Sequence, residues 1–178
     1  WSAKGSVLVG AASNNQFGYA VSLSDDGDTL AVGAPDESLS TGKVYVYRWD
    51  ALASPPAWAT PVAIPGEDTF ENFGRALALN SDGTLVVVGA RGNDDGGSDS
   101  GETRVFSVGS VSATQRGIDI PGEAAGDYSG HAVAVSDDGN IIAIGAPDND
   151  GGGVDSGHVR TWGWNGSSWV QRGSDIDG

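Results

Sequence analysis

Short apolar runs separated by turns rich in glycine and aspartate fill the chain, and the clearest set lies in its last third. Asp138-Gly139 and Asn165-Gly166 favour the positive φ angles of tight hairpins. The pattern predicts four antiparallel strands in this region, at residues 131–135, 141–144, 159–164 and 169–172. The second run is almost continuously apolar, which predicts burial on both faces. No segment has helical periodicity, so we expect an all-β fold.

Four sequence landmarks recur at a constant interval of 56 residues. They are a glycine before the first strand (Gly18, Gly74, Gly130), an Asp-Gly turn (Gly27, Gly83, Gly139), a Gly-Ala pair (from Gly33, Gly89, Gly145) and a tripeptide that begins with isoleucine (Ile64, Ile120, Ile176). Such self-similarity is the mark of a repeat architecture. The chain therefore contains three copies of one structural unit.

A sandwich and a propeller can both be built from units of four strands, but only the propeller requires tandem units at one interval. Small residues at Ala20, Ala76 and Ala132 suit strands crowded around an axis. We expect three consecutive four-stranded blades of a larger propeller of about seven blades. Residues 11–66, 67–122 and 123–178 form the blades, and residues 1–10, marked by Trp1, form the last strand of a preceding one. Further blades of the same chain, or neighbouring copies, are expected to complete the ring.

Charge and composition exclude several classes of protein. The net charge of −15 repels the phosphates of nucleic acids and of anionic membranes, and no apolar run is long enough for a membrane-spanning helix. The absence of cysteine removes disulfides and thiolate sites. His131 and His158 have no histidine counterparts in the other units, and no nucleophile motif accompanies them. We expect a protein that is not an enzyme.

The repeated landmarks resemble FG-GAP repeats of integrin α-subunit propellers and related surface proteins. Phe17-Gly18 and Phe73-Gly74 match the first half of the motif, with Ser129-Gly130 in the third unit. Gly33-Ala34-Pro35 and Gly145-Ala146-Pro147 match the second half. The resemblance implies a propeller at the cell surface or in the extracellular space. In that family the loop between the first two strands often binds calcium, but here the loop is shorter and lacks the closing aspartate, so we interpret it as an aspartate-stabilised turn.

The loops that follow the Gly-Ala pairs of the second and third units are the better candidates for Ca²⁺. Short acidic and amide side chains followed by glycines let a tight loop direct several oxygens to one centre. The candidate ligands are Asn93, Asp95 and Asp99 in the second unit, and Asp148, Asp150 and Asp155 in the third. The alternative is that these side chains only satisfy backbone groups of a surface loop.

The tryptophans and one Asn-Gly-Ser tripeptide could have a binding or modification role, or a purely structural one. The tryptophans recur at repeat positions, which favours packing between blades, but Trp58 follows an irregular insertion and is the candidate for a more exposed, sugar-stacking ring. Asn165-Gly166-Ser167 has the form of an N-glycosylation acceptor, which would make the protein a glycoprotein if it is secreted by a eukaryote.

From these observations we expect a non-catalytic extracellular or cell-surface interaction module, in adhesion or as a structural part of a surface assembly. It would present acidic loops to a protein or glycan on a cell surface or in the extracellular matrix. The alternatives are an accessory propeller of a larger secreted enzyme and a calcium-dependent lectin.

Overall fold

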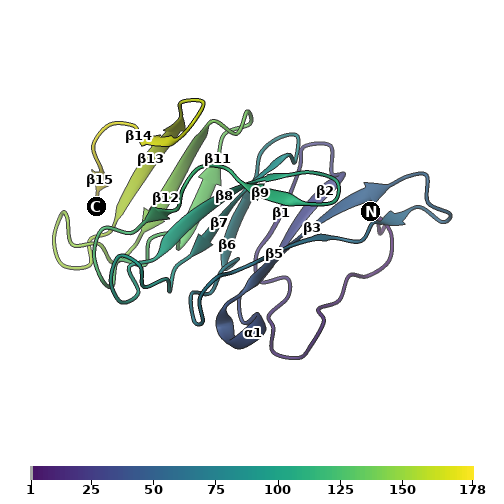
Figure 1. The fold of residues 1–178 in the computed structure, drawn as a ribbon, viewed down its shortest axis with the longest axis horizontal. Coiled ribbons are helices and arrows are strands. Elements are labelled where there is room, and N and C mark those ends of the chain that lie inside the picture. The colour runs from purple at the N-terminus through teal and green to yellow at the C-terminus, as the bar shows by residue number, and fades with distance from the viewer. Residues whose placement is uncertain (1) are drawn as a thin grey trace.

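A computed structural model describes residues 2–178, which form three antiparallel β-sheets arranged side by side (Figure 1). The first sheet, blade 1, contains β1 (Val21–Leu23), β2 (Thr29–Ala34), β3 (Lys43–Asp50), β4 (Ala57–Trp58) and β5 (Val62–Pro65). Blade 2 contains β6 (Ala76–Leu79), β7 (Leu85–Ala90), β8 (Glu102–Val108), β9 (Ala113–Gln115) and β10 (Ile120–Pro121). Blade 3 contains β11 (Ala132–Val135), β12 (Ile141–Ala146), β13 (His158–Trp164), β14 (Trp169–Gln171) and β15 (Ile176–Asp177). The prediction of an all-β fold with three blade-like units is confirmed.

The outer strand of each blade is interrupted, which the sequence did not predict. In blade 3, β14 and β15 both pair with β13, so together they take the place of one fourth strand. Gly173 lies in the interruption with a φ of +79°, and Gly117 holds the equivalent place in blade 2 with a φ of +90°. These left-handed residues bend the chain between two short strands that still share a neighbour.

The one element assigned as helical, α1 (Glu37–Ser40), is a single turn between β2 and β3. Its residues Ser38 and Leu39 have φ angles of 56° and 61°, so the turn is left-handed. None of the helices in residues 2–178 is long and apolar enough to cross a membrane.

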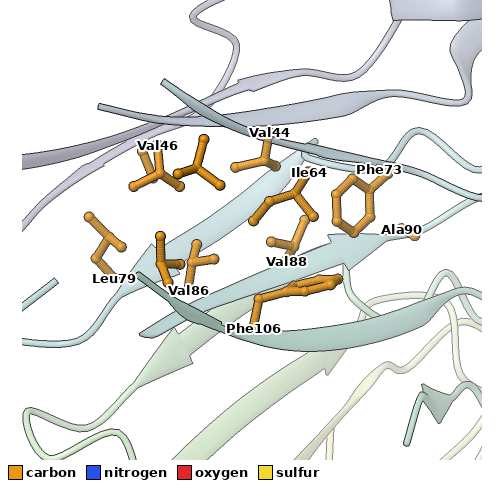
Figure 2. Packing of buried hydrophobic residues seen from close by; sticks show 12 residues of the cluster. Val44, Val46, Ile64, Phe73, Leu79, Val86, Val88, Ala90 and Phe106 are labelled. Atoms are coloured by element: carbon orange, nitrogen blue, oxygen red, sulfur yellow. The ribbon is translucent and has the colours of Figure 1, made fainter. Parts of the chain in front are cut away.

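Apolar side chains fill the spaces between neighbouring blades. One cluster joins Val44, Val46 and Ile64 of blade 1 to Phe73 and Phe106 of blade 2 (Figure 2). A second cluster joins blade 2 to blade 3 and includes Ile142, Ile144 and Trp169. The inner strand β6 contacts both β1 and β11, so the first strands of the three blades lie next to one another. The core therefore lies between the sheets, as in stacked repeats.

The hairpin turns between the first two strands follow the predicted chemistry. In blade 3, Asp138 accepts hydrogen bonds from the Ser136 hydroxyl at 2.6 Å and from the backbone N–H of Asn140 at 3.0 Å. These bonds, the Ser136 bond above all, lower the pKa of Asp138 to about 2. Asp26 accepts the same pair of bonds from Ser24 and Asp28, and Asp82 accepts bonds from the Asn80 side-chain amide and from the backbone N–H and hydroxyl of Thr84. The interpretation of these loops as aspartate-stabilised turns is confirmed.

Candidate functional site

The Phe73–Gly74 corner joins blade 2 to blade 1. The Phe73 side chain is fully buried and lies edge-on to Phe106, with 5.9 Å between ring centroids. Its backbone N–H donates to the Thr41 carbonyl at 3.2 Å. Gly74 follows with a φ of +86°, in the left-handed region that favours glycine. The corner thereby places the start of blade 2 directly on the backbone of blade 1.

The Gly-Ala pairs receive these corners. A Cβ atom at Gly33 would lie 2.0 Å from the Gly74 carbonyl oxygen, and one at Gly89 would lie 1.9 Å from that of Gly130. No side chain fits at such separations, so glycine is required where two blades meet backbone to backbone. The two halves of the repeated motif therefore meet across each joint between blades.

A buried ionic cluster lies behind the corner of blade 2. The Arg104 guanidinium is 2.6 Å from a Glu71 oxygen, 2.8 Å from a Glu102 oxygen and 3.2 Å from a Glu67 oxygen, and it stacks 4.5 Å from the Phe73 ring centroid. Burial raises the pKa of Glu102 to about 7, against the opposing effect of Arg104. Burial is the main reason that Glu102 is only partly ionised near neutral pH, and the neighbouring carboxylates add to the effect.

The loop from β7 to β8 contains three of the predicted calcium ligands. Asn93 is buried, donates to Glu71 at 3.4 Å and accepts the backbone N–H of Asp95 at 2.9 Å. Asp95 is exposed, and the backbone N–H of Asp99 donates to Asp94 at 2.8 Å. Asn93 therefore fixes the base of the loop. Asp94, which the sequence analysis did not select, organises its tip.

The loop from β12 to β13 repeats this arrangement. Asn149 is buried, donates to Asp127 at 2.9 Å and accepts the backbone N–H of Gly151 at 2.8 Å. Asp150 accepts the backbone N–H of Asp155 at 2.8 Å, while Asp148 and Asp155 are exposed. Asn149 and Asp150 thus correspond to Asn93 and Asp94, so the two predicted ligand sets match only at Asp99 and Asp155. Extending the 56-residue alignment of the repeats through this loop would have identified Asn149 and Asp94.

A small acidic hollow opens beside the blade 2 loop. It has a volume of about 240 Å³ and is lined by Asp68, Thr69, Gly92, Asn93, Asp94 and Asp95. Asp68 comes from the segment that connects β5 to β6, so two loops from the same end of the blades form the hollow. Carboxylate and amide oxygens around a hollow suit a cation or a basic group of a partner.

The repeated geometry agrees with a comparison of sequences. A family model described as FG-GAP repeat matches residues 7–47 and 66–106. The chain carries FG-GAP repeats. The matched segments include Phe17-Gly18 and Phe73-Gly74, whereas Ser129 stands at the phenylalanine position of the third unit. No curated protein matches the chain.

Two solved structures share the fold at low sequence identity. Hydrazine synthase from Kuenenia stuttgartiensis aligns with a TM-score of 0.53 and 14% identity over 97% of this chain. Sqt1 from Saccharomyces cerevisiae aligns with a TM-score of 0.52 and 13% identity over 93% of this chain. The chain spans 41% and 36% of these two chains. At such identities the likeness concerns the fold of the FG-GAP segment alone.

Tryptophan pairs pack in the outer parts of blades 1 and 3. Trp164 and Trp169 of blade 3 lie 5.3 Å apart between ring centroids, and Trp49 and Trp58 of blade 1 lie 5.4 Å apart. Trp58 is only half-exposed and occupies the place in β4 that Trp169 occupies in β14. Trp58 is more exposed than Trp169, which is 7% exposed, and it packs edge-on against Trp49; sugar stacking by this ring stays a prediction.

A grouping of acidic residues around His158 was not predicted from the sequence. Glu123, His158 and Asp175 each place a potential ligand atom within 4.8 Å of the others, the one such group of three or more in residues 2–178. Arg160 lies 3.5 Å from Glu123, and this positive charge opposes an added cation. The same positions in blade 2 hold Glu67, Glu102 and Asp119 beside Arg104, so the grouping is the blade 3 form of the ionic cluster.

Proposed function

We propose that this chain is part of a non-catalytic extracellular or cell-surface interaction module that presents acidic loops to a protein or a glycan. The acidic hollow at Asp68, Asp94 and Asp95 is the observation that supports the proposal. A module that presents such an acidic surface would act in adhesion or as a structural part of a surface assembly.

The loops have rigid bases and exposed tips. Asn93 and Asn149 are buried at 3% and 6% exposure, and each is anchored to an acidic side chain of the preceding corner. The carboxylates beyond them are exposed, so a partner meets charges that are already held in place. A net charge of −15 favours a basic partner, or one that is bridged through Ca²⁺.

Asp68→Asn combined with Asp95→Asn tests the proposal by removing two of the three carboxylates at the hollow. The probes are an array of extracellular-matrix proteins and a glycan array, each in the presence of Ca²⁺ and of EDTA. We expect the double variant to lose at least about tenfold in affinity for whatever the parent chain binds. Loss with EDTA would identify Ca²⁺ as the bridge and favour a calcium-dependent lectin if the bound probe is a glycan.

The matched control is Asp25→Asn combined with Asp137→Asn. Both residues lie in the turns after β1 and β11, at the opposite end of the blades from the hollow, and the change in charge is the same. Equal losses in the two double variants would point to a general charge effect and contradict a site at the hollow. No binding by the parent chain to either array would contradict the proposed function itself and favour an accessory propeller of an enzyme.

A further inference from the structure

The turn between β13 and β14 contains the one Asn-Gly dipeptide of the sequence, Asn165-Gly166. Asn165 is exposed, and the backbone N–H of Gly166 donates no hydrogen bond to any group within residues 2–178. A Cβ added at Gly166 would meet nothing within 4 Å. The peptide nitrogen that follows Asn165 is therefore unpaired in the described chain, and no side chain of its own residue shields it.

Three donors surround the side-chain oxygen of Asn165. The backbone N–H groups of Ser167 and Ser168 each donate to Oδ1 at 2.9 Å, and the Ser167 hydroxyl donates to it at 3.0 Å. The side-chain nitrogen Nδ2 donates to the Ser168 hydroxyl at 3.0 Å. Donors placed around a carbonyl oxygen stabilise the negative charge that develops there when a nucleophile attacks the carbon. The turn therefore favours attack on Cγ of Asn165.

Buried asparagines of the chain lack this combination. Asn80 is 4% exposed, and the residue after it, Ser81, donates its backbone N–H to a carbonyl of the next blade at 3.2 Å. Asn93 and Asn149 are buried, and an aspartate follows each of them. A side chain on the following residue crowds its nitrogen and restricts its backbone, whereas glycine does neither. Asn165 is thus the better placed for attack by the nitrogen of the next residue.

We propose that Asn165 is a site of spontaneous deamidation, in which Gly166 supplies the nucleophile and the two serines assist. The Gly166 nitrogen loses its proton and forms a bond to Cγ of Asn165, while the charge on Oδ1 is held by its three donors. The Cγ–Nδ2 bond then breaks and Nδ2 leaves as ammonia, which gains one proton and so balances the one lost. One water molecule opens the five-membered succinimide at either carbonyl, giving aspartate or isoaspartate.

Isoaspartate at this position changes the joint between blades 2 and 3. Its main chain runs through the side-chain carbon, so the turn becomes longer by one methylene group. The turn connects Trp164 to Trp169, which are paired across β13 and β14, and the Trp169 indole donates to the Arg116 carbonyl of blade 2 at 2.7 Å. The modification therefore loosens this contact as the protein ages. It does not depend on what the acidic loops bind.

Incubation of the unglycosylated 178-residue chain at about pH 8 tests the proposal, because the attacking nitrogen must lose a proton. Trypsin releases residues 161–172 between Arg160 and Arg172, and mass spectrometry follows the conversion of the amide to a carboxylate in that peptide. We expect deamidation at Asn165 to be at least about tenfold faster than at Asn80 and Asn93, which serve as references in the same digest. A rate no faster than theirs would overturn the proposal.

Ser167→Ala tests the part played by the donors. It removes the hydroxyl and leaves both backbone N–H groups in place, so we expect deamidation at Asn165 to slow by about threefold or more. Ser174→Ala is the matched control, because this exposed serine of the same blade lies outside the turn, and its rate should equal that of the parent. A parental rate in Ser167→Ala would overturn the assignment of the hydroxyl.

Asn165→Gln tests the effect on the joint. Its longer side chain cannot form the five-membered ring, so we expect no conversion at this position. Hydrogen exchange over β14 is compared between fresh and aged samples of the parent and of the variant. We expect faster exchange in the aged parent alone. Equal exchange in the fresh and the aged parent, once conversion is complete, would overturn the loosening of the joint.

Discussion

Strands β7 and β12 occupy the same position in consecutive blades, yet they differ in burial. Every residue of β7 is buried, whereas β12 alternates between buried and more exposed residues. Leu85 begins β7 at 2% exposure, and Ile141 begins β12 at 38%. Within residues 2–178, blade 2 packs against a blade on each side and blade 3 packs against one. Burial in this protein is therefore a property of the joint between two blades rather than of the strand alone.

Loss of Arg104 should give the largest difference between the two blades. Arg104→Met leaves Glu71 and Glu102 buried without their cation, and we expect unfolding free energy to fall by about 3–5 kcal/mol. Arg160→Met should cost only about 1–2 kcal/mol, because its partner Glu123 is 42% exposed and regains water. Urea denaturation followed by tryptophan fluorescence measures both. Equal losses of unfolding free energy in the two variants would show that burial of the glutamate partners does not determine the cost.

The apolar start of the second strand gives the next largest contrast. Leu85→Ala removes packing from a filled joint and should lower the unfolding free energy by about 3 kcal/mol. Ile141→Ala removes a side chain that already meets water and should cost about 1 kcal/mol. The same denaturation measurement applies. A cost for Ile141→Ala as large as that for Leu85→Ala would contradict an open face on blade 3.

Glu102 makes the stability of blade 2 depend on pH. Blade 3 has no such buried glutamate, because His158 stands at the corresponding position. Burial raises the pKa of Glu102 from its ordinary 4.5 to about 7, so the folded chain holds the proton more tightly than the unfolded chain does. Stability from this group is therefore complete below pH 4.5 and falls as the pH rises through 7, by about 3 kcal/mol in total. Glu102→Gln should match the parent at pH 4.5 and exceed it in stability at pH 8. An unchanged difference between the two chains across that range would refute the assignment.

The hairpin turns should show the smallest effect and no contrast between blades. Thr84→Ala in blade 2 and Ser136→Ala in blade 3 each remove the hydrogen bond that contributes most to the lowered pKa of the neighbouring aspartate. The pKa values of Asp82 and Asp138 should both rise toward the ordinary range, as followed by NMR titration. A rise in only one blade would mean that these turns, too, depend on their neighbours.

The sequence predicted what is local and repeated. The Asp-Gly turns, the strand positions and the three units follow from a period of 2 within strands and of 56 between units. It also predicted burial of both faces for residues 141–144, but Ile141 is 38% exposed in the part of the chain that the structure describes. The ionic cluster was missed: Arg104 and Glu102 lie on β8, whereas Glu67 and Glu71 lie in the corner segment before β6, so their meeting depends on how that corner folds back on the sheet of its own blade.

For the acidic loops, too, the sequence predicted the location but not the contacts between distant segments. The sequence located both acidic loops, since aspartate and glycine cluster there, but it could not separate anchors from exposed tips. Asn93 and Asn149 are anchors because each reaches an acidic residue of its own blade's corner, a contact between segments about 22 residues apart. The six predicted calcium ligands stay a prediction, and binding to the arrays in the presence of Ca²⁺ and of EDTA tests whether Ca²⁺ takes part.

The bonds between hairpin turns bear on how the chain unfolds. Asp25 donates its backbone N–H to the Ser81 carbonyl at 2.9 Å, and Ser81 donates its own to the Asp137 carbonyl at 3.2 Å, so adjacent blades are tied edge to edge by a relay that involves only nearest neighbours. In such an arrangement each blade is stabilised only by the blades next to it, so the middle blade, which has two neighbours here, is the most stable. Blade 2 should be the last to open and blade 3 among the first, so heating would produce fraying from an end rather than a single all-or-none transition.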